Sequence, residues 1–272
     1  MNDHARFNPT HREYHVQRWH DGQVSPATDK VAEEVPVSLV YNGMPHVVMM
    51  ASPADLEDFA LGFSLSEGVL QRREELYVTE VSVVSEGIEI RMDIDLQRFL
   101  PIEEQHRNLA GRTGCGLCGA ETIEQAVRHP AKVGNGVKVA ASALEAAYVR
   151  LAERQQLNRM TGAVHAAAWA NPGGELIVVR EDVGRHNALD KMIGAIAREG
   201  RSFDEGFALI TSRASFEMAQ KAATVGITLL AAISAPTGLA IRLAEETGLT
   251  LIGFARGSQC NVYTNPRRLI SA

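Results

Sequence analysis

From Val35 onward, hydrophobic and polar positions follow regular patterns, and the first of these predicts a small α+β unit. Two apolar runs flank Asn42-Gly43, a dipeptide that is typical of a β-hairpin turn. A stretch with helical spacing of apolar residues follows, and two more strand-like runs then flank Glu86-Gly87. The predicted elements are strands at residues 35–41, 45–50, 76–84 and 88–94 and a helix at residues 53–70.

Beyond residue 142 the pattern alternates between long helical and short apolar stretches. Ser142 and Glu145 have the spacing of a capping box at the start of the first helix. The alternation predicts an α/β layer domain with a largely parallel sheet. The predicted helices are residues 142–157, 186–198, 215–225 and 237–247, and the predicted strands are 164–170, 175–179, 207–211, 229–233 and 251–254.

The first 28 residues are polar and show no periodicity, so we expect a flexible tail there. They also lack the apolar core of a signal peptide, and no apolar run reaches membrane-spanning length. The predicted organisation is a tail over residues 1–28, a small α+β domain over 29–108, a connection over 109–141 and an α/β domain over 142–272.

Composition narrows the choice of compartment and partner. The 272 residues are 45% hydrophobic and carry a net charge of −6, which gives no electrostatic reason to bind nucleic acid. Three cysteines make no disulfide framework, so we expect reduced thiols and a cytoplasmic location without membrane attachment. An anionic ligand would need a local basic site.

The most informative stretch is the glycine-rich loop that carries Cys115 and Cys118. These two thiols are separated by two residues, so they can share one small site, and the three glycines around them free the backbone to admit a bulky partner. The nearby Arg112 would favour a thiolate. A thiolate can accept sulfur, hold it as a persulfide and release it by attack at sulfur.

Other roles for the cysteine pair remain open at this point. A structural zinc site would need four ligands, and only Cys260 is left among the cysteines. A thioredoxin-like redox site would place the pair at a strand-to-helix junction, and a purely structural pair would sit poorly in so glycine-rich a loop. Nucleobase deamination is rejected because His165 has Ala167 where the H-x-E motif has glutamate, and because it follows the cysteine pair instead of preceding it. No metal site is predicted.

Three predicted strands end in polar turns that lead into helices, at residues 181–187, 211–215 and 234–238. Helix N-termini bind phosphate, and ligands of open α/β sheets gather at the carboxyl ends of strands. A fourth strand ends in a segment suited to a nucleotide, which consists of Phe254, Ala255, Arg256, Gly257, Ser258 and Gln259. The simpler interpretation makes Ser215 and Thr237 helix caps, His186 a loop hydrogen-bonding residue and Cys260 a bystander.

Together these stretches resemble the FdhD family of formate dehydrogenase accessory sulfurtransferases. The resemblance rests on the cysteine loop and on segments along most of the chain. These segments are residues 34–37, 62–68, 161–165, 181–191, 211–221 and 234–263.

The resemblance implies a cytidine-deaminase-like α/β/α domain beside a smaller N-terminal α+β domain. It also implies a homodimer that takes persulfide sulfur from a cysteine desulfurase onto Cys115, with Cys118 in support. The sulfur would pass to the bis-molybdopterin guanine dinucleotide cofactor, bound at residues 254–259, before that cofactor enters formate dehydrogenase. A non-catalytic escort of the same cofactor is the alternative function.

Overall fold

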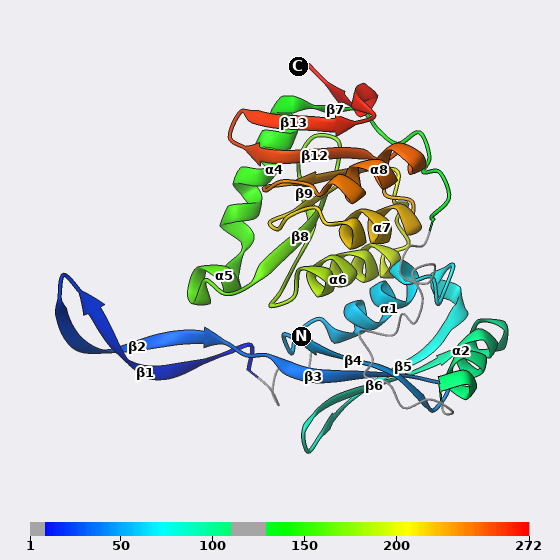
Figure 1. Cartoon of the computed structure of the whole chain (residues 1–272), viewed down its shortest axis with the longest axis horizontal. Helices are drawn as coiled ribbons and strands as arrows, with labels where there is room; N and C mark the ends of the chain where they lie inside the picture. The colour runs from blue at the N-terminus through cyan, green and yellow to red at the C-terminus, as the bar shows by residue number, and fades with distance from the viewer. Residues whose placement is uncertain (1–8, 110–128, 272) are drawn as a thin grey trace.

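The structure, a computed structural model, describes residues 9–109 and 129–271, with the side chains of residues 105–109 left out of the description. It is a mixed α/β protein, as the sequence predicted (Figure 1). Two of its sheets are large, with four and six strands, and two are two-stranded. No helix in the described residues is long and apolar enough to cross a lipid bilayer.

The four-stranded sheet confirms both predicted hairpins. Its strand order is β4-β3-β6-β5. Asn42 and Gly43 both have positive φ, 47° and 82°, as a tight hairpin turn between these strands requires. Helix α1 packs on one face of the sheet. The elements are β3 (Val35–Tyr41), β4 (Met44–Ala51), α1 (Leu56–Ser66), β5 (Leu76–Val84) and β6 (Gly87–Ile94).

Two helices of this half were not predicted. A 3₁₀ turn, η2 (Arg73–Glu75), precedes β5, and α2 (Leu96–Leu109) follows β6. Pro101 lies inside α2. Proline is tolerated in the first turn of a helix but disrupts later turns. The sequence pattern therefore indicated the end of the α+β unit near Pro101 and not a helix across it.

The six-stranded sheet has the order β13-β12-β11-β10-β8-β9 and is mixed, so the prediction of a largely parallel sheet was wrong. Only the β10–β11 and β11–β12 pairs are parallel, whereas β8 and β13 pair antiparallel with their neighbours. Hairpins, not helical crossovers, join β8 to β9 and β12 to β13. The strands are β8 (His165–Ala170), β9 (Leu176–Asp182), β10 (Phe207–Ile210), β11 (Leu229–Ala232), β12 (Thr250–Arg256) and β13 (Gln259–Thr264).

Helices cover both faces of this sheet, as an α/β/α layer domain requires. One face shares its hydrophobic core with three helices, and the other packs against α4. A specific likeness to cytidine deaminases stays a prediction. The helices are α4 (Ala141–Arg154), α5 (Gln156–Thr161), α6 (Arg185–Arg198), α7 (Phe216–Thr224) and α8 (Gly238–Thr247).

The predicted capping box at Ser142 does not form. Helix α4 begins directly after β7 (Val139–Ala140), which pairs with β14 (Leu269–Ile270), and its N-cap is Ala140 without a side-chain hydrogen bond. The pairing of β7 with β14 makes the helix begin at Ala141, one residue before the start that the sequence pattern predicted. The C-terminal strand follows a 3₁₀ turn, η3 (Pro266–Arg268).

The two halves share one continuous hydrophobic core, because α1 lies against α6. Gly62 of α1 faces the carbonyl of Asp190, and Gly194 of α6 faces the carbonyl of Asp58, so closely that a Cβ at either glycine would overlap the facing oxygen. The two glycines therefore set the distance between the helices. The predicted boundaries near residues 108 and 142 stay a prediction.

The N-terminal region differs from the predicted flexible tail. Strands β1 (His11–His20) and β2 (Gln23–Ala32) form a two-stranded antiparallel sheet with ten paired residues on each strand. Asp21 and Gly22 make its turn with positive φ. Figure 1 shows this hairpin, called the arm below, extending away from the rest of the molecule.

Candidate functional site at the carboxyl edge of the large sheet

The cysteine loop lies outside the described residues. Cys115, Cys118 and Arg112 all fall between residues 110 and 128. The predicted roles of these side chains therefore stay predictions, and the described site consists of the groups on the sheet.

The three predicted strand ends do come together at one edge of the six-stranded sheet. The Ala166 N–H donates to Thr211 Oγ1 at 2.9 Å, which joins the start of β8 to the end of β10. The Thr237 N–H donates to the Ala214 carbonyl at 3.1 Å, and the Phe254 N–H donates to the Ser234 carbonyl at 3.2 Å. These bonds place the starts of α7 and α8 next to the bend in β12.

Much of the segment at residues 181–187 is structural. Glu181 accepts hydrogen bonds from the Leu157 and Asn158 N–H groups, at 2.9 and 2.8 Å, at the start of α5. Asp182 is fully buried and accepts from the Gly184 N–H at 2.8 Å and from the Asn187 side chain at 3.0 Å. Of the charged and imidazole side chains in this segment, only Arg185 and His186 are left to bind a ligand at the sheet edge.

Arg185 and His186 begin α6 and meet Glu217 in the first turn of α7. His186 Nε2 lies 2.7 Å from Glu217 Oε2, although poorly aligned for a regular hydrogen bond. Arg185 Nη2 is 3.9 Å from the same carboxylate. Burial lowers the pKa of His186, and the positive charges of Arg185 and Lys221 lower it further, against the opposing effect of Glu217.

His165 adds a second imidazole at this edge, at the first position of β8 opposite Asp182. Its pKa is lowered, first by burial and then by the charge of Arg185, while Asp182 acts in the opposite direction. Both imidazoles are thus biased toward the neutral form, in which one ring nitrogen donates and the other accepts.

The helix-start residues Ser215 and Thr237 behave differently. Thr237 caps α8, because its Oγ1 accepts a hydrogen bond from the Ala240 N–H at 3.4 Å. Ser215 occupies the N-cap position of α7 but makes no capping hydrogen bond, and its Oγ is buried without a partner. The capping interpretation is therefore confirmed for the Thr237 side chain and not for that of Ser215.

Four buried side-chain polar atoms make no regular hydrogen bond within the described residues, and three of them are at this edge: Arg185 Nε, Ser215 Oγ and His186 Nε2, of which His186 Nε2 still has the Glu217 carboxylate 2.7 Å away. The fourth, Thr228 Oγ1, lies beside Gly136. Buried polar groups in folded proteins are nearly always paired, so such a concentration marks a place where a ligand can supply the missing partners. Donors from two helix starts suit an anion.

Residues 254–259 form the end of β12 and its turn into β13, so no helix follows this strand. The register of the two strands shifts between Gly253 and Arg256, and Phe254 has a φ of 52° there. Positive φ is a strained conformation for a bulky aromatic residue. The bulge leaves the Phe254 ring 46% exposed, and bulges beside active sites commonly redirect a side chain in this way.

The other members of this segment are divided between the edge and the opposite face. Exposed Arg256 donates from Nε to the Ile233 carbonyl at 3.1 Å, which holds it at the end of β11. Ala255 is buried against α4. Gly257, Ser258 and Gln259 line a shallow hollow with Cys260, whose thiol pKa is raised by burial.

Sequence reasoning missed two buried lysines at the α1–α6 junction. Lys191 is fully buried, 2.6 Å from Asp182 and 2.9 Å from the Ser52 carbonyl that accepts from it. Lys221 lies 2.8 Å from Asp190 and 2.7 Å from Glu67. The available signal was Asp190-Lys191, two charges inside an otherwise apolar helical face.

No group of three or more His, Cys, Asp or Glu side chains suited to a metal ion occurs in residues 9–109 and 129–271. The prediction of no metal site stays a prediction.

Comparison with known proteins gives consistent matches over nearly the whole chain. The sequence profile of the FdhD/NarQ family matches residues 32–270. A sulfur carrier protein FdhD of Cupriavidus necator is 51% identical over 261 residues, which cover 96% of this chain and 91% of that protein. A protein of the same name in Xanthomonas euvesicatoria is 53% identical over 254 residues, covering 93% and 90% of the two chains.

A solved structure has a similar fold. It is the crystal structure of a candidate formate dehydrogenase accessory protein from Desulfotalea psychrophila, with a TM-score of 0.79. The alignment covers 96% of this chain and all of the other at 24% identity. At this identity the likeness establishes the fold alone.

Proposed function

The chain belongs to the FdhD/NarQ family, and we propose that it is a sulfurtransferase that carries sulfur for the maturation of formate dehydrogenase. The single observation that supports this most is the identity of 51–53% to proteins named as sulfur carriers. The paired thiols of Cys115 and Cys118 supply the chemistry that such a carrier needs.

Sulfur arrives at Cys115 by thiol–persulfide exchange. The Cys115 thiolate attacks the outer sulfur of a persulfide on a cysteine desulfurase, the sulfur–sulfur bond of the donor breaks, and the donor leaves as a thiolate. The transferred sulfur keeps its oxidation state and becomes the outer atom of a persulfide on Cys115. Cys118 supports the transfer from two residues away.

The acceptor is the guanine dinucleotide form of the molybdenum cofactor, bis-molybdopterin guanine dinucleotide, bound as a substrate. The partnerless donors at the starts of α6 and α7 support this proposal, because Arg185 Nε and Ser215 Oγ fit the oxygens of a phosphate. The exposed ring of Phe254 offers a stacking surface for a base, and Arg256 brings a positive charge beside it.

The partners follow from the same proposal. A cysteine desulfurase donates the sulfur, formate dehydrogenase is the client, and the protein acts in the cytoplasm as a homodimer. Neither nucleic acid nor a membrane has a part in this function.

The alternative function is a non-catalytic escort that binds the cofactor without carrying sulfur. The partnerless groups at the sheet edge serve either function. The two differ at Cys115, which an escort does not need.

Intact mass spectrometry tests the carrier function directly. After incubation with a desulfurase and cysteine, the wild-type protein should gain the mass of sulfur, and Cys115→Ala should gain much less. Cys260→Ala is the matched control and should load normally, because burial raises the pKa of that thiol. Equal loading of Cys115→Ala and wild type would exclude Cys115 as the carrier.

Titration calorimetry with guanosine diphosphate tests the cofactor site. Arg256→Ala should weaken binding about ten-fold, as the loss of one charge-assisted phosphate hydrogen bond predicts. Arg201→Ala is a control, because Arg201 is exposed beyond the far end of α6. Unchanged affinity in Arg256→Ala would remove this residue from the site.

Formate dehydrogenase activity in cells that carry one variant as the sole copy separates the two functions. Cys115→Ala should bind the nucleotide and fail to activate the dehydrogenase. Arg256→Ala should accept sulfur and deliver it poorly. Full activity with Cys115→Ala would favour the escort.

A further inference from the structure

The arm carries exposed apolar side chains on both of its faces. Trp19 and Val24, paired across the strands, are 72% and 46% exposed. On the opposite face, Tyr14 and Val31 are 49% and 41% exposed. Aromatic residues exposed to this degree are typical of binding surfaces, where tryptophan is the most frequent anchor.

The rest of the described chain covers little of the arm. Its main contact with another described element is between β2 and the short helix α5, and its two strands join no other sheet. An isolated two-stranded hairpin is at best marginally stable in water. The arm therefore needs a further surface to pack against, and it points away from its own core (Figure 1).

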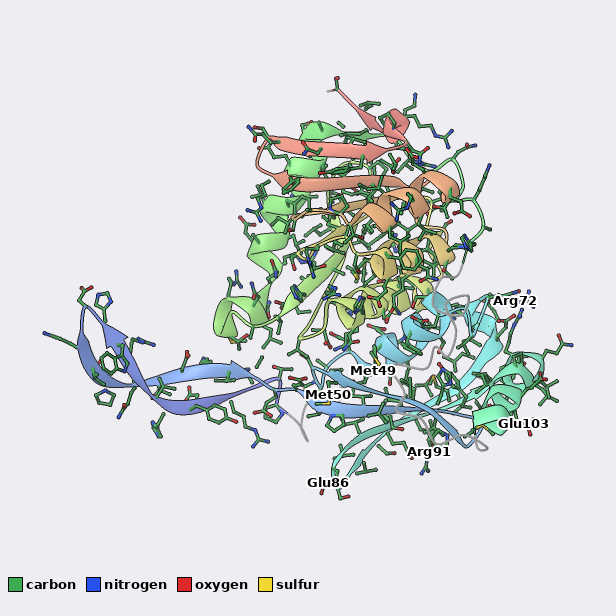
Figure 2. All side chains as sticks on the ribbon, viewed as in Figure 1. Met49, Met50, Arg72, Glu86, Arg91 and Glu103 are labelled. Atoms are coloured by element: carbon green, nitrogen blue, oxygen red, sulfur yellow. The ribbon has the colours of Figure 1, made fainter. Side chains whose placement is uncertain are left out.

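A suitable surface lies on the four-stranded sheet, on the face turned away from α1. Strand register places Met50, Val48 and Val84 on this outer face, and they are 46%, 62% and 47% exposed. Figure 2 shows Met50 close to the point where the arm joins the sheet. Within the described residues, one molecule thus presents an uncovered arm and an uncovered sheet face with exposed apolar side chains.

The charges of the two surfaces are complementary. Strand register places Arg12 and Arg18 on the same face of the arm as Tyr14 and Val31, against one acid, Asp29. The outer face carries Glu80, Glu89 and Asp93 around Arg91. A basic strand on an acidic rim favours association and fixes its direction.

The area is sufficient for a stable dimer if the exchange is reciprocal. Ten strand residues span about 34 Å, and two strands are about 10 Å wide, so each face covers roughly 340 Å². Two arms on two sheet faces would bury roughly 1,400 Å², within the range of about 1,200–2,000 Å² for specific interfaces.

We propose that the arm of one molecule packs on the outer face of the four-stranded sheet of a second copy, and that the second copy returns the contact. This is a two-fold exchange, with Tyr14 and Val31 as anchors on the arm and Val48 and Met50 as their counterpart on the sheet. The inference rests on the homodimer in the proposed function and not on sulfur carriage. The arm lies almost entirely before residue 32, where the match to the family profile begins.

Sedimentation equilibrium over a concentration series tests the exchange in the full-length protein. Wild type should be a dimer. Tyr14→Glu and the double variant Val48→Glu/Met50→Glu should each raise the dimer dissociation constant at least about 30-fold, as expected for the loss of an interface anchor. Val149→Glu is the matched control, because Val149 is 56% exposed on α4, and it should leave the dimer intact.

A mixing experiment distinguishes exchange from other uses of the arm. A chain lacking residues 1–31 keeps the sheet face, and Val48→Glu/Met50→Glu keeps the arm. Each should be monomeric alone, and the two should form a heterodimer through one arm. A monomeric wild type, a dimer without the arm, or dimers of the sheet-face variant that match wild type would each overturn the proposal.

Persulfide loading is measured on the same monomeric variants, so that the test of arm exchange does not depend on the test of sulfur carriage. A protein that loads sulfur on Cys115 but fails the mixing experiment refutes the exchange alone. A protein that exchanges arms but never loads sulfur refutes the carrier function alone.

Discussion

The α1–α6 junction and the carboxyl edge of the large sheet both bury polar groups, but they differ in whether these groups have hydrogen-bond partners. At the junction, Lys191 and Lys221 each contact a carboxylate and a further oxygen. At the edge, Arg185 Nε and Ser215 Oγ are buried with no partner in the described residues. The same sequence thus satisfies one set of buried groups and leaves the other available.

The difference separates structural residues from candidates for binding. A buried ion pair with its hydrogen bonds made costs much to break, so the junction holds α1 against α6. A buried donor without a partner destabilises the unliganded fold, and a ligand that pairs with it removes this cost. Burial of charge alone therefore does not indicate function, whereas burial without a partner does.

The largest expected effect is the loss of Lys191. Lys191→Met leaves Asp182 buried without its countercharge, and we expect the free energy of unfolding to fall by about 3 to 5 kcal/mol. Urea unfolding monitored by circular dichroism measures it. Lys138 is exposed, so Lys138→Met should change stability by less than about 0.5 kcal/mol.

A second substitution sharpens this result. Lys191→Met/Asp182→Asn removes the uncompensated charge and should recover part of the loss. Equal stabilities of Lys191→Met and Lys138→Met would show that the junction does not depend on its ion pair.

Next in size is the loss of close helix contact at Gly194. In Gly194→Ala the new Cβ overlaps the Asp58 carbonyl, so α1 and α6 must separate, at about 1 to 3 kcal/mol. Gly238 begins α8, and a Cβ there would meet only the Arg242 side chain at 3.6 Å. Thermal unfolding should show a lower midpoint for Gly194→Ala and an equal or higher one for Gly238→Ala.

At the edge, the expected effects are smaller and depend on pH. The pKa of His186 is lowered in the fold, so below about pH 6.5 the unfolded chain binds a proton that the folded chain binds only at lower pH. Stability therefore falls as pH drops through this range. His186→Gln should remove that part of the fall. Glu217→Gln should steepen it, because Glu217 opposes the pKa shift. Parallel curves of unfolding midpoint against pH would contradict this assignment.

Local patterns in the sequence predicted most elements but not how they pair. The hairpin at Asn42-Gly43 and the helices α6, α7 and α8 were correct because each follows from residues close in the chain. The predicted strand direction in the large sheet was wrong, because it depends on β8 and β13, whose pairing partners are set by tertiary contacts. The arm was missed because its strands mix polar and apolar residues on both faces, so neither face has the alternation of a half-buried strand.

Prediction of the candidate site from the sequence had the same limit, because the position of its residues could be predicted but their partners could not. The meeting of three strand ends was predictable, because β9, β10 and β11 run in the same direction and strands of one direction end at one edge of a sheet. The partner of each side chain was not, since Glu181 and Asp182 resembled ligand-binding residues and instead hold α5 and Lys191. The spacing of Cys115 and Cys118 indicated a reactive pair of thiols, and their role stays a prediction.

The smallest expected effect is at Ser215, and it tests the comparison most sharply. Ser215→Ala removes a hydroxyl that makes no hydrogen bond in the described structure, so unfolding free energy should change by less than about 0.5 kcal/mol. Thr237→Ala removes a real cap from α8 and should cost about 1 kcal/mol. For guanosine diphosphate the order should reverse, with weaker binding in Ser215→Ala than in Thr237→Ala, because a ligand is then the only partner that Ser215 loses. A stability loss in Ser215→Ala as large as that in Thr237→Ala would mean that its hydroxyl is satisfied within the fold, and the distinction between the two regions would fail at this residue.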